Sequence, residues 1–163
     1  MKKIIPRLKL SKGSTLVEFT IIASFFFLLI FAIIEFGRLL FTWHVLNETS
    51  RRTARLASVC QVSTTEQQDT KLAGLIDNVP LPNFSVANVD VSYLDSIGNK
   101  IEGDLSETLL YNQVEFVEVK IINYQIALLI PLATFDVTFT APEFSTTLPR
   151  ESLGVTRTGY TDC

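Results

Sequence analysis

An uncharged apolar run near the start of the chain limits what this sequence can form. The run extends from Phe19 to Ile34, and it begins at Leu16 if one acidic residue, Glu18, is tolerated inside it. As an α-helix, residues 16–34 reach about 30 Å, which matches the hydrocarbon thickness of a bilayer. The remaining residues are too few for two full-sized cores. We therefore expect a single membrane-spanning helix followed by one small domain, the head, at residues 59–163.

Charge is distributed unevenly on the two sides of this run. The segment before Gly13 carries basic side chains and no acidic one: Lys2, Lys3, Arg7, Lys9 and Lys12. By the positive-inside rule, this segment lies in the cytoplasm and the residues beyond about 40 lie across the membrane. A secretory signal peptide would have a shorter apolar region with a small-residue cleavage site directly after it, whereas "IIEFGRLLFTWH" follows here. A simple uncleaved anchor fits the hydropathy, but it leaves Gly13 and Glu18 without a reason.

The acidic residue inside the apolar run needs a partner. A carboxylate in hydrocarbon costs about 2.5–3.5 kcal/mol at the centre of a helix and less near the interface. No Lys or Arg lies three or four residues after Glu18. If the chain is cut after Gly13, Ser14 becomes a new N-terminus, and its ammonium could neutralise Glu18 of a neighbouring subunit. Such pairing would also fix the stagger between assembled helices.

These residues resemble the type IV prepilin pattern. A basic leader ends at Gly13, an acid (Glu18) is the fifth residue after it, an aromatic residue (Phe19) comes next, and an apolar helix follows. The short leader, "STLVEF" and the later "EFGR" are most similar to the TadE-like pseudopilins of tight-adherence (Flp) pilus systems. The resemblance implies that a prepilin peptidase cuts after Gly13, that Ser14 is the mature terminus, and that Glu18 is the acid used in processing or assembly.

The same resemblance implies a location and a function. The protein would be a minor pilin or pseudopilin of the bacterial inner membrane that supports assembly of a tight-adherence (Flp, type IVb-like) pilus, and through it adhesion and biofilm formation. Its expected partners are the membrane, the prepilin peptidase, other pilins or pseudopilins, and proteins of the assembly platform. Two alternatives stay open: an uncleaved single-pass periplasmic scaffold or sensor, and a pseudopilin of a type II secretion system.

Helical spacing continues beyond Ile34 to about Ser58, and no proline interrupts it. Glu35 and Arg38 are three residues apart on one face, which predicts an ion pair at the outer interface. Trp43 suits the headgroup zone. A stripe of small residues then predicts either close packing on the head and on neighbouring helices, or an amphipathic helix that lies only on the sheet of its own chain: Ser50, Thr53, Ala54 and Ala57.

The head combines helix and strand signals. Residues 63–80 predict a short second helix. Residues 86–94, 114–126 and 134–141 alternate apolar and polar side chains, which predicts three strands of a half-buried antiparallel sheet, with "SIGNK" as a turn. Residues 126–135 predict either a buried crossover or an apolar patch for a partner or the outer leaflet. The expected class is α+β and pilin-like, with a basic leader at 1–13, a transmembrane and extended helix at 14–58, and a periplasmic head at 59–163.

The remaining chemical signals are few. Cys60 and Cys163 are a candidate disulfide if the head lies in an oxidising compartment, and the alternative is a pair of unlinked thiols. The sequence contains no metal-ligand spacing, nucleotide loop or framed carboxylate pair, so we expect no enzyme, catalytic residue, metal, cofactor or small-molecule substrate. The charge balance suggests no nucleic-acid surface. A second basic cluster favours a solvated face, with a specific anion or lipid site as the alternative: Arg51, Arg52 and Arg55.

Overall fold

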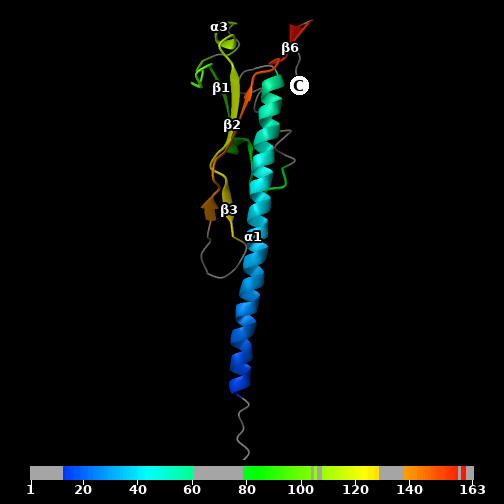
Figure 1. The fold of residues 1–163 in the computed structure, drawn as a ribbon, viewed down its shortest axis with the longest axis vertical. Helices are drawn as coiled ribbons and strands as arrows, with labels where there is room; N and C mark the ends of the chain where they lie inside the picture. Colours follow the sequence, from blue (N-terminus) through cyan, green and yellow to red (C-terminus); the bar gives the residue numbers. More distant parts are fainter. Residues whose placement is uncertain are drawn as a thin grey trace, which may run out of the picture. The chain divides into compact units, whose positions relative to one another are not determined.

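The computed structural model describes residues 13–60, 79–103, 105, 108–128, 138–157 and 159–160. By its internal contacts the chain divides into two units, Met1–Arg38 and Leu39–Cys163. One helix, α1 (Ser14–Val59), crosses the boundary between them (Figure 1). The expected second helix lies outside the described residues except for residues 79 and 80, which are not helical. The expected domain division at 13/14 and 58/59 concerns processing and membrane topology, and it stays a prediction.

The second unit is built on a three-stranded antiparallel sheet. Its central strand is β2 (Phe116–Ile121), which pairs with β1 (Val89–Leu94) on one side and with β5 (Phe144–Pro149) on the other. A 3-10 turn, η1 (Val86–Asn88), leads into β1. The expected "SIGNK" turn is present, because Leu94 forms a bridge with Lys100 and Gly98 adopts a φ of 88° that favours glycine. A long apolar helix followed by a small antiparallel sheet confirms the α+β class.

The third strand of the sheet differs from the one that we expected. The described part of residues 134–141 forms a short strand, β4 (Thr138–Thr140), which pairs with β3 (Gln125–Ala127) in a separate two-stranded sheet. The edge beside β2 is taken by β5, which places Phe144, Thr146 and Leu148 on one face and Ser145 and Thr147 on the other. Sequence reasoning gave too little weight to threonine, a β-branched residue that fits a half-buried strand well.

Three short elements complete the described fold. A single helical turn, α3 (Thr108–Tyr111), lies between β1 and β2 in the sequence. Two very short strands, β6 (Val155–Thr156) and β7 (Gly159–Tyr160), pair with each other after β5. Of the apolar stretch at 126–135, only residues 126–128 are described, and Ile126 is buried there. Whether the rest is a crossover or an exposed patch stays open.

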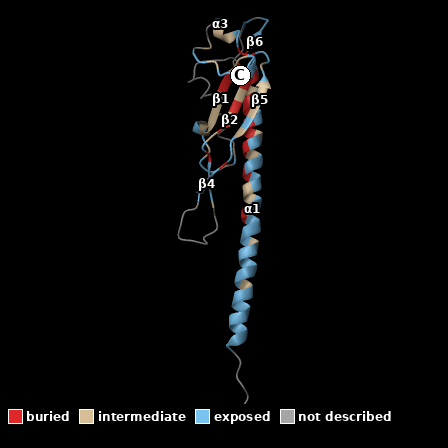
Figure 2. Ribbon diagram, turned by 60° about the vertical axis from the view of Figure 1, so that its left-hand side comes forward, coloured by how far each residue is buried: buried red, intermediate tan, exposed pale blue. Residues whose placement is uncertain are grey.

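The sheet packs its apolar face against residues 39–59 of α1, and two core clusters result. The first cluster gathers around Leu46 of the helix and Ile121 of β2. The second gathers around Val117 of β2 and Tyr93 of β1, with Ala57 of the helix partly buried beside them. Figure 2 shows buried residues along this part of α1 and exposed residues along its N-terminal part. The head therefore covers one face of the helix.

Small side chains on α1 allow this close packing. The buried positions recur every three or four residues along one helix face: Thr42, Leu46, Thr49, Ser50, Thr53, Ala54 and Ser58. The Ser50 hydroxyl lies 3.0 Å from the Thr146 hydroxyl of β5, which joins helix and sheet directly. Of the two expected partners for the small-residue stripe, the structure shows the sheet of the same chain.

A distant turn caps the C-terminal end of α1. The last carbonyl groups of a helix have no partner within the helix itself. Here the Ser58 carbonyl accepts hydrogen bonds from the backbone N–H groups of Glu151 and Leu153, at 3.2 and 3.3 Å. The Val59 carbonyl accepts from the Gly154 N–H at 2.6 Å and from the Ser152 hydroxyl at 3.1 Å. Residues 151–154, the capping turn, thus fix where the helix ends.

One buried hydroxyl on the packed face of α1 predicts a stabilising substitution. Thr53 is 0% exposed, and its Oγ1 has no hydrogen-bond partner in the part of the chain that the structure describes. A buried polar group without a partner carries an uncompensated desolvation cost. We expect Thr53→Val, which keeps the shape, to raise the free energy of unfolding by about 1 kcal/mol. Urea unfolding of the full chain in detergent micelles, followed by circular dichroism, measures this change.

The matched control is Thr49→Val, one turn earlier on the same buried face. The Thr49 hydroxyl donates to the Val45 carbonyl at 2.8 Å, so its replacement removes a satisfied group and should give no gain. A Thr53→Val protein less stable than the wild type would contradict the assignment of an unpaired hydroxyl.

Candidate processing site and membrane helix

Gly13 precedes the first residue of α1 and is exposed. Its carbonyl accepts the first helical hydrogen bond, from the Val17 N–H at 3.4 Å. A Cβ built at Gly13 would meet no atom within 4 Å, and its φ is not in the left-handed region. The fold itself therefore does not require glycine here. Gly37 is equally open, so open space alone does not mark a processing site. Gly13 is a candidate only because the basic leader precedes it and Glu18 follows it.

The structure places Ser14, Glu18 and Phe19 in the first turns of α1, on its exposed surface. Within the described ranges, the Glu18 carboxylate forms no ion pair or hydrogen bond. Phe19, next to it, is also exposed. The geometry thus leaves an acid without a partner one turn into an apolar surface. A cation for it would have to come from another molecule or from the aqueous interface.

The surface of α1 after Glu18 suits lipid. The helix is long and apolar enough to cross a membrane, and its most apolar window is not covered by the rest of the described chain. Two hydroxyls in this stretch are satisfied within the helix: Thr20 donates to the Leu16 carbonyl and Ser24 to the Thr20 carbonyl, each at 2.8 Å. Sequence reasoning did not use these hydroxyls, although their four-residue spacing was a signal. Backbone and side-chain polar groups here therefore need no water.

Glu35 and Arg38 lie together at the end of the first unit. The Arg38 guanidinium donates to the Glu35 carboxylate, as an i,i+3 ion pair. The Glu35 residue is 9% exposed, and the side chains of the pair are 12% and 25% exposed for Glu35 and Arg38. The two side chains are thus largely withdrawn from solvent, and their opposite charges neutralise each other.

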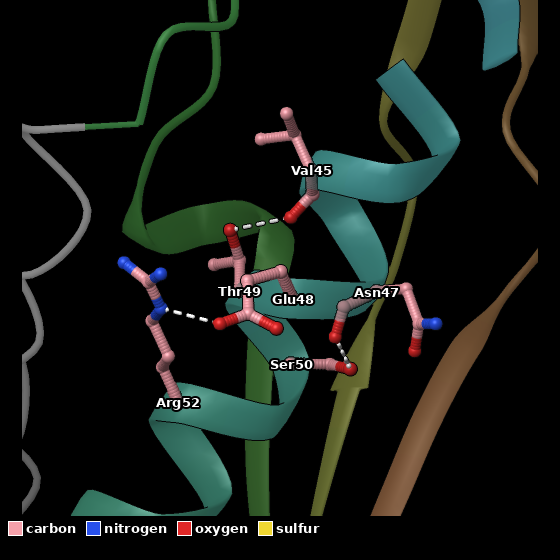
Figure 3. Close-up of polar contacts among 6 residues, drawn as sticks. All are labelled: Val45, Asn47, Glu48, Thr49, Ser50 and Arg52. Carbon is pink, nitrogen blue, oxygen red and sulfur yellow. Dashed lines mark hydrogen bonds and ion pairs between the residues drawn. The ribbon is translucent and has the colours of Figure 1, made fainter. Parts of the chain in front are cut away.

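Polar side chains of α1 form local contacts further along the helix (Figure 3). Glu48 accepts from Arg52 at 2.7 Å, while Thr49 and Ser50, on the packed side, donate to carbonyls one turn earlier. Arg51, Arg52 and Arg55 are all exposed, as expected for a solvated face. His44 is exposed on the same helix. No cluster of three metal-ligating side chains is found among the described residues.

Charged groups on the head form local pairs and turns. Hydrogen bonds from the backbone of Asn99, and then of Ile97, hold the pKa of the Asp95 carboxyl below its usual range, which stabilises the turn after β1. On β2, the hydrogen bond and charge of Glu118 raise the pKa of Lys120, 3.0 Å away. These contacts organise a turn and a strand surface, and they assemble no reactive centre.

Cys60 follows directly after α1 and is 5% exposed. It is not a free thiol. Cys163 lies outside the described residues, so the bridge between the two cysteines stays a prediction.

The processing candidates, the apolar helix surface and the ion pair all lie between Gly13 and Arg38, and comparison with known proteins covers this same part. A family described as TadE-like protein matches residues 13–55. Residues 13–55 are TadE-like. No curated protein and no solved structure matches the chain. The TadE-like segment begins at Gly13 and contains nearly all of α1. The TadE-like family is a family of pilus components and not of enzymes, so the match supports involvement in a tight-adherence pilus system.

Proposed function

We propose that this protein is a minor pilin or pseudopilin that supports assembly of a tight-adherence (Flp, type IVb-like) pilus. The observation that carries the proposal is the position of the TadE-like segment, which begins at Gly13, where the basic leader gives way to the apolar helix. The leader would lie in the cytoplasm, α1 would cross the bacterial inner membrane once, and the head would lie in the periplasm. Through the assembled fibre the protein would serve surface adhesion and biofilm formation.

In this proposal a prepilin peptidase hydrolyses the peptide bond between Gly13 and Ser14. Access to the bond is supported by the exposure of Gly13 and by the open space beside it, where an added Cβ would meet no atom of the described residues within 4 Å. Hydrolysis releases the basic leader and leaves Ser14 with a free ammonium. That ammonium, on a neighbouring subunit, would pair with Glu18, which has no cation within the described ranges of its own chain. Processing would thus supply the positive charge that the assembled helices need.

The test is mass spectrometry of the membrane form, made with and without the peptidase of a tight-adherence system. We expect an N-terminus at Ser14 with the peptidase and at Met1 without it. Gly13→Leu should reduce cleavage by more than about 90%, because the peptidase, and not the fold, requires a small residue at this position. The matched control is Gly37→Ala, which fills an equally open position and should be cleaved normally.

Glu18→Ala separates insertion from assembly. Membrane insertion should be intact, because removing a charge from the apolar run makes insertion easier. Processing or piliation should be impaired. Normal piliation of this variant would exclude the proposed role of Glu18.

The two alternative functions predict different results for the same membrane preparations. An uncleaved scaffold or sensor keeps Met1 even when the peptidase is present, which would overturn the pilin proposal. A type II secretion pseudopilin would be cleaved too, so it is distinguished by its partners. Cross-linking in the membrane should recover a Flp-type pilin and assembly-platform proteins, and recovery of secretion pseudopilins in their place would overturn the assignment to tight adherence.

A further inference from the structure

The apolar surface of α1 does not stop where the uncharged run stops. Beyond Ile34, three large apolar side chains remain about half exposed or more in the folded chain: Phe36 at 61%, Leu40 at 46% and Phe41 at 52%. Trp43 is 37% exposed. In water these side chains would form an apolar belt on an otherwise polar part of the helix. The belt is continuous with the exposed apolar surface of residues 16–34.

Lengths along the helix distinguish two positions for the hydrocarbon. A span of Leu16–Ile34 covers about 28 Å, and a span of Phe19–Phe41 covers about 34 Å, which a tilted helix accommodates. From Ile34 to Trp43 the helix rises about 14 Å, whereas the interfacial layer on each side of the hydrocarbon is only about 5–8 Å thick. A hydrocarbon boundary at Ile34 would leave Trp43 in bulk water. A boundary at Phe41 places Trp43 at the headgroups, where tryptophan is enriched.

The charges favour the outer position as well. The Leu16–Ile34 span contains Glu18, which has no cation within the described ranges. The Phe19–Phe41 span moves Glu18 to the cytoplasmic interface and takes in Glu35 and Arg38 instead. These two neutralise each other and are already largely withdrawn from solvent. A paired charge close to the interface is tolerated in a membrane more readily than a single one.

We propose that acyl chains of the outer leaflet cover α1 as far as Phe41, so that the hydrocarbon span is Phe19–Phe41. Glu35 and Arg38 are then an ion pair within the membrane, and Trp43 marks the outer headgroup layer. The inference rests on the proposed function, in which α1 anchors the protein in the membrane, and it specifies how deeply the helix is inserted. Leu39, in the same stretch, packs against the core cluster around Leu46 and Ile121.

The experiment uses the full chain in phosphatidylcholine vesicles whose acyl chains carry bromine, a depth-dependent quencher of tryptophan. The chain has one tryptophan, so a Trp43→Phe background is dark. Phenylalanines along α1 allow conservative probes in this background: Phe25→Trp, Phe31→Trp and Phe36→Trp. The centre of Leu16–Ile34 is residue 25, and the centre of Phe19–Phe41 is residue 30. The probe nearest the bilayer centre therefore decides between the two spans.

We expect deep bromines to quench the Phe31→Trp variant most, and the Phe25→Trp variant less. Bromines near the headgroups should quench the Phe36→Trp variant and the natural Trp43, whose emission should be blue-shifted. Phe116→Trp, on a partly exposed position of β2, is the aqueous control and should respond to acrylamide and not to brominated lipid.

Three results would overturn the proposal. Strongest quenching at residue 25 would place the hydrocarbon at Leu16–Ile34. A Trp43 and a Phe36→Trp variant shielded from both bromine and acrylamide would show that protein, and not lipid, covers the belt. The absence of bromine quenching at positions 25, 31 and 36 together would show that α1 does not span the bilayer, and only this result would also remove the proposed anchoring.

Discussion

Leu46→Ala is expected to lower the free energy of unfolding by about 2–5 kcal/mol, a large part of the stability of a small domain. Leu46 is 0% exposed and belongs to the cluster that joins α1 to β2 and β3. Truncation removes three carbon atoms of the buried side chain and leaves a cavity that helix and sheet can close only in part. Urea unfolding of the full chain in detergent micelles should show a lower midpoint with an unchanged slope.

Leu40→Ala is the matched control, since it makes the same chemical change on the same helix. Leu40 is 46% exposed and lies outside both core clusters, so its loss should cost less than about 1 kcal/mol. Equal losses at residues 40 and 46 would contradict the packing of the head on one face of α1.

Removal of the candidate disulfide should be the second large effect. We expect Cys163→Ser and Cys60→Ala each to lower the free energy of unfolding by about 2–5 kcal/mol, because a native bridge restricts the unfolded chain. Cys60, which follows the last residue of α1, is buried and is not a free thiol. Reduction of the wild-type protein should reproduce the loss, and alkylation before and after reduction, read by mass spectrometry, should report two masked thiols.

The two substitutions should not add, because each removes the same bond. Cys60→Ala should cost slightly more than Cys163→Ser, since it also removes a buried sulfur. Additive losses, or two thiols that react with an alkylating agent without reduction, would show that the cysteines are not bonded to each other.

The helix was predictable to within one residue, and the reason is physical. An apolar run of bilayer length leaves no alternative for the backbone, and the absence of proline lets the helix continue to Val59. Strands β1 and β2 were predictable for a similar reason, since Val91, Val119 and Ile121 alternate with charged residues. The strand beside β2 was not. The segments around Phe139 and Phe144 both have the composition of a strand. Only the packing of the whole head decides which of the two pairs with β2.

The candidate site was predictable as a pattern of residue types but not as a set of contacts. Gly13, Glu18 and Phe19 stand out from the sequence because of the change in polarity around them. The pairing of Glu35 with Arg38 follows from their spacing, and the structure contains it. The exposed belt at Phe36–Phe41 could not be inferred, because sequence does not tell which apolar side chains the head leaves uncovered. The capping turn was equally hidden, since nothing local relates Ser58 to Leu153.

That capping turn has a consequence for when the protein can finish folding. The Ser152 hydroxyl and the Val59 carbonyl that it meets are 93 residues apart in the sequence. If the head is translocated as proposed, α1 emerges long before Gly154, so the carbonyl groups at the end of the helix are hydrated until the capping turn arrives. Loop closure over such a distance is slow compared with helix formation. An incompletely synthesised head therefore has an uncapped helix terminus, and in the proposed topology the native state can form only after nearly all of the chain has been translocated.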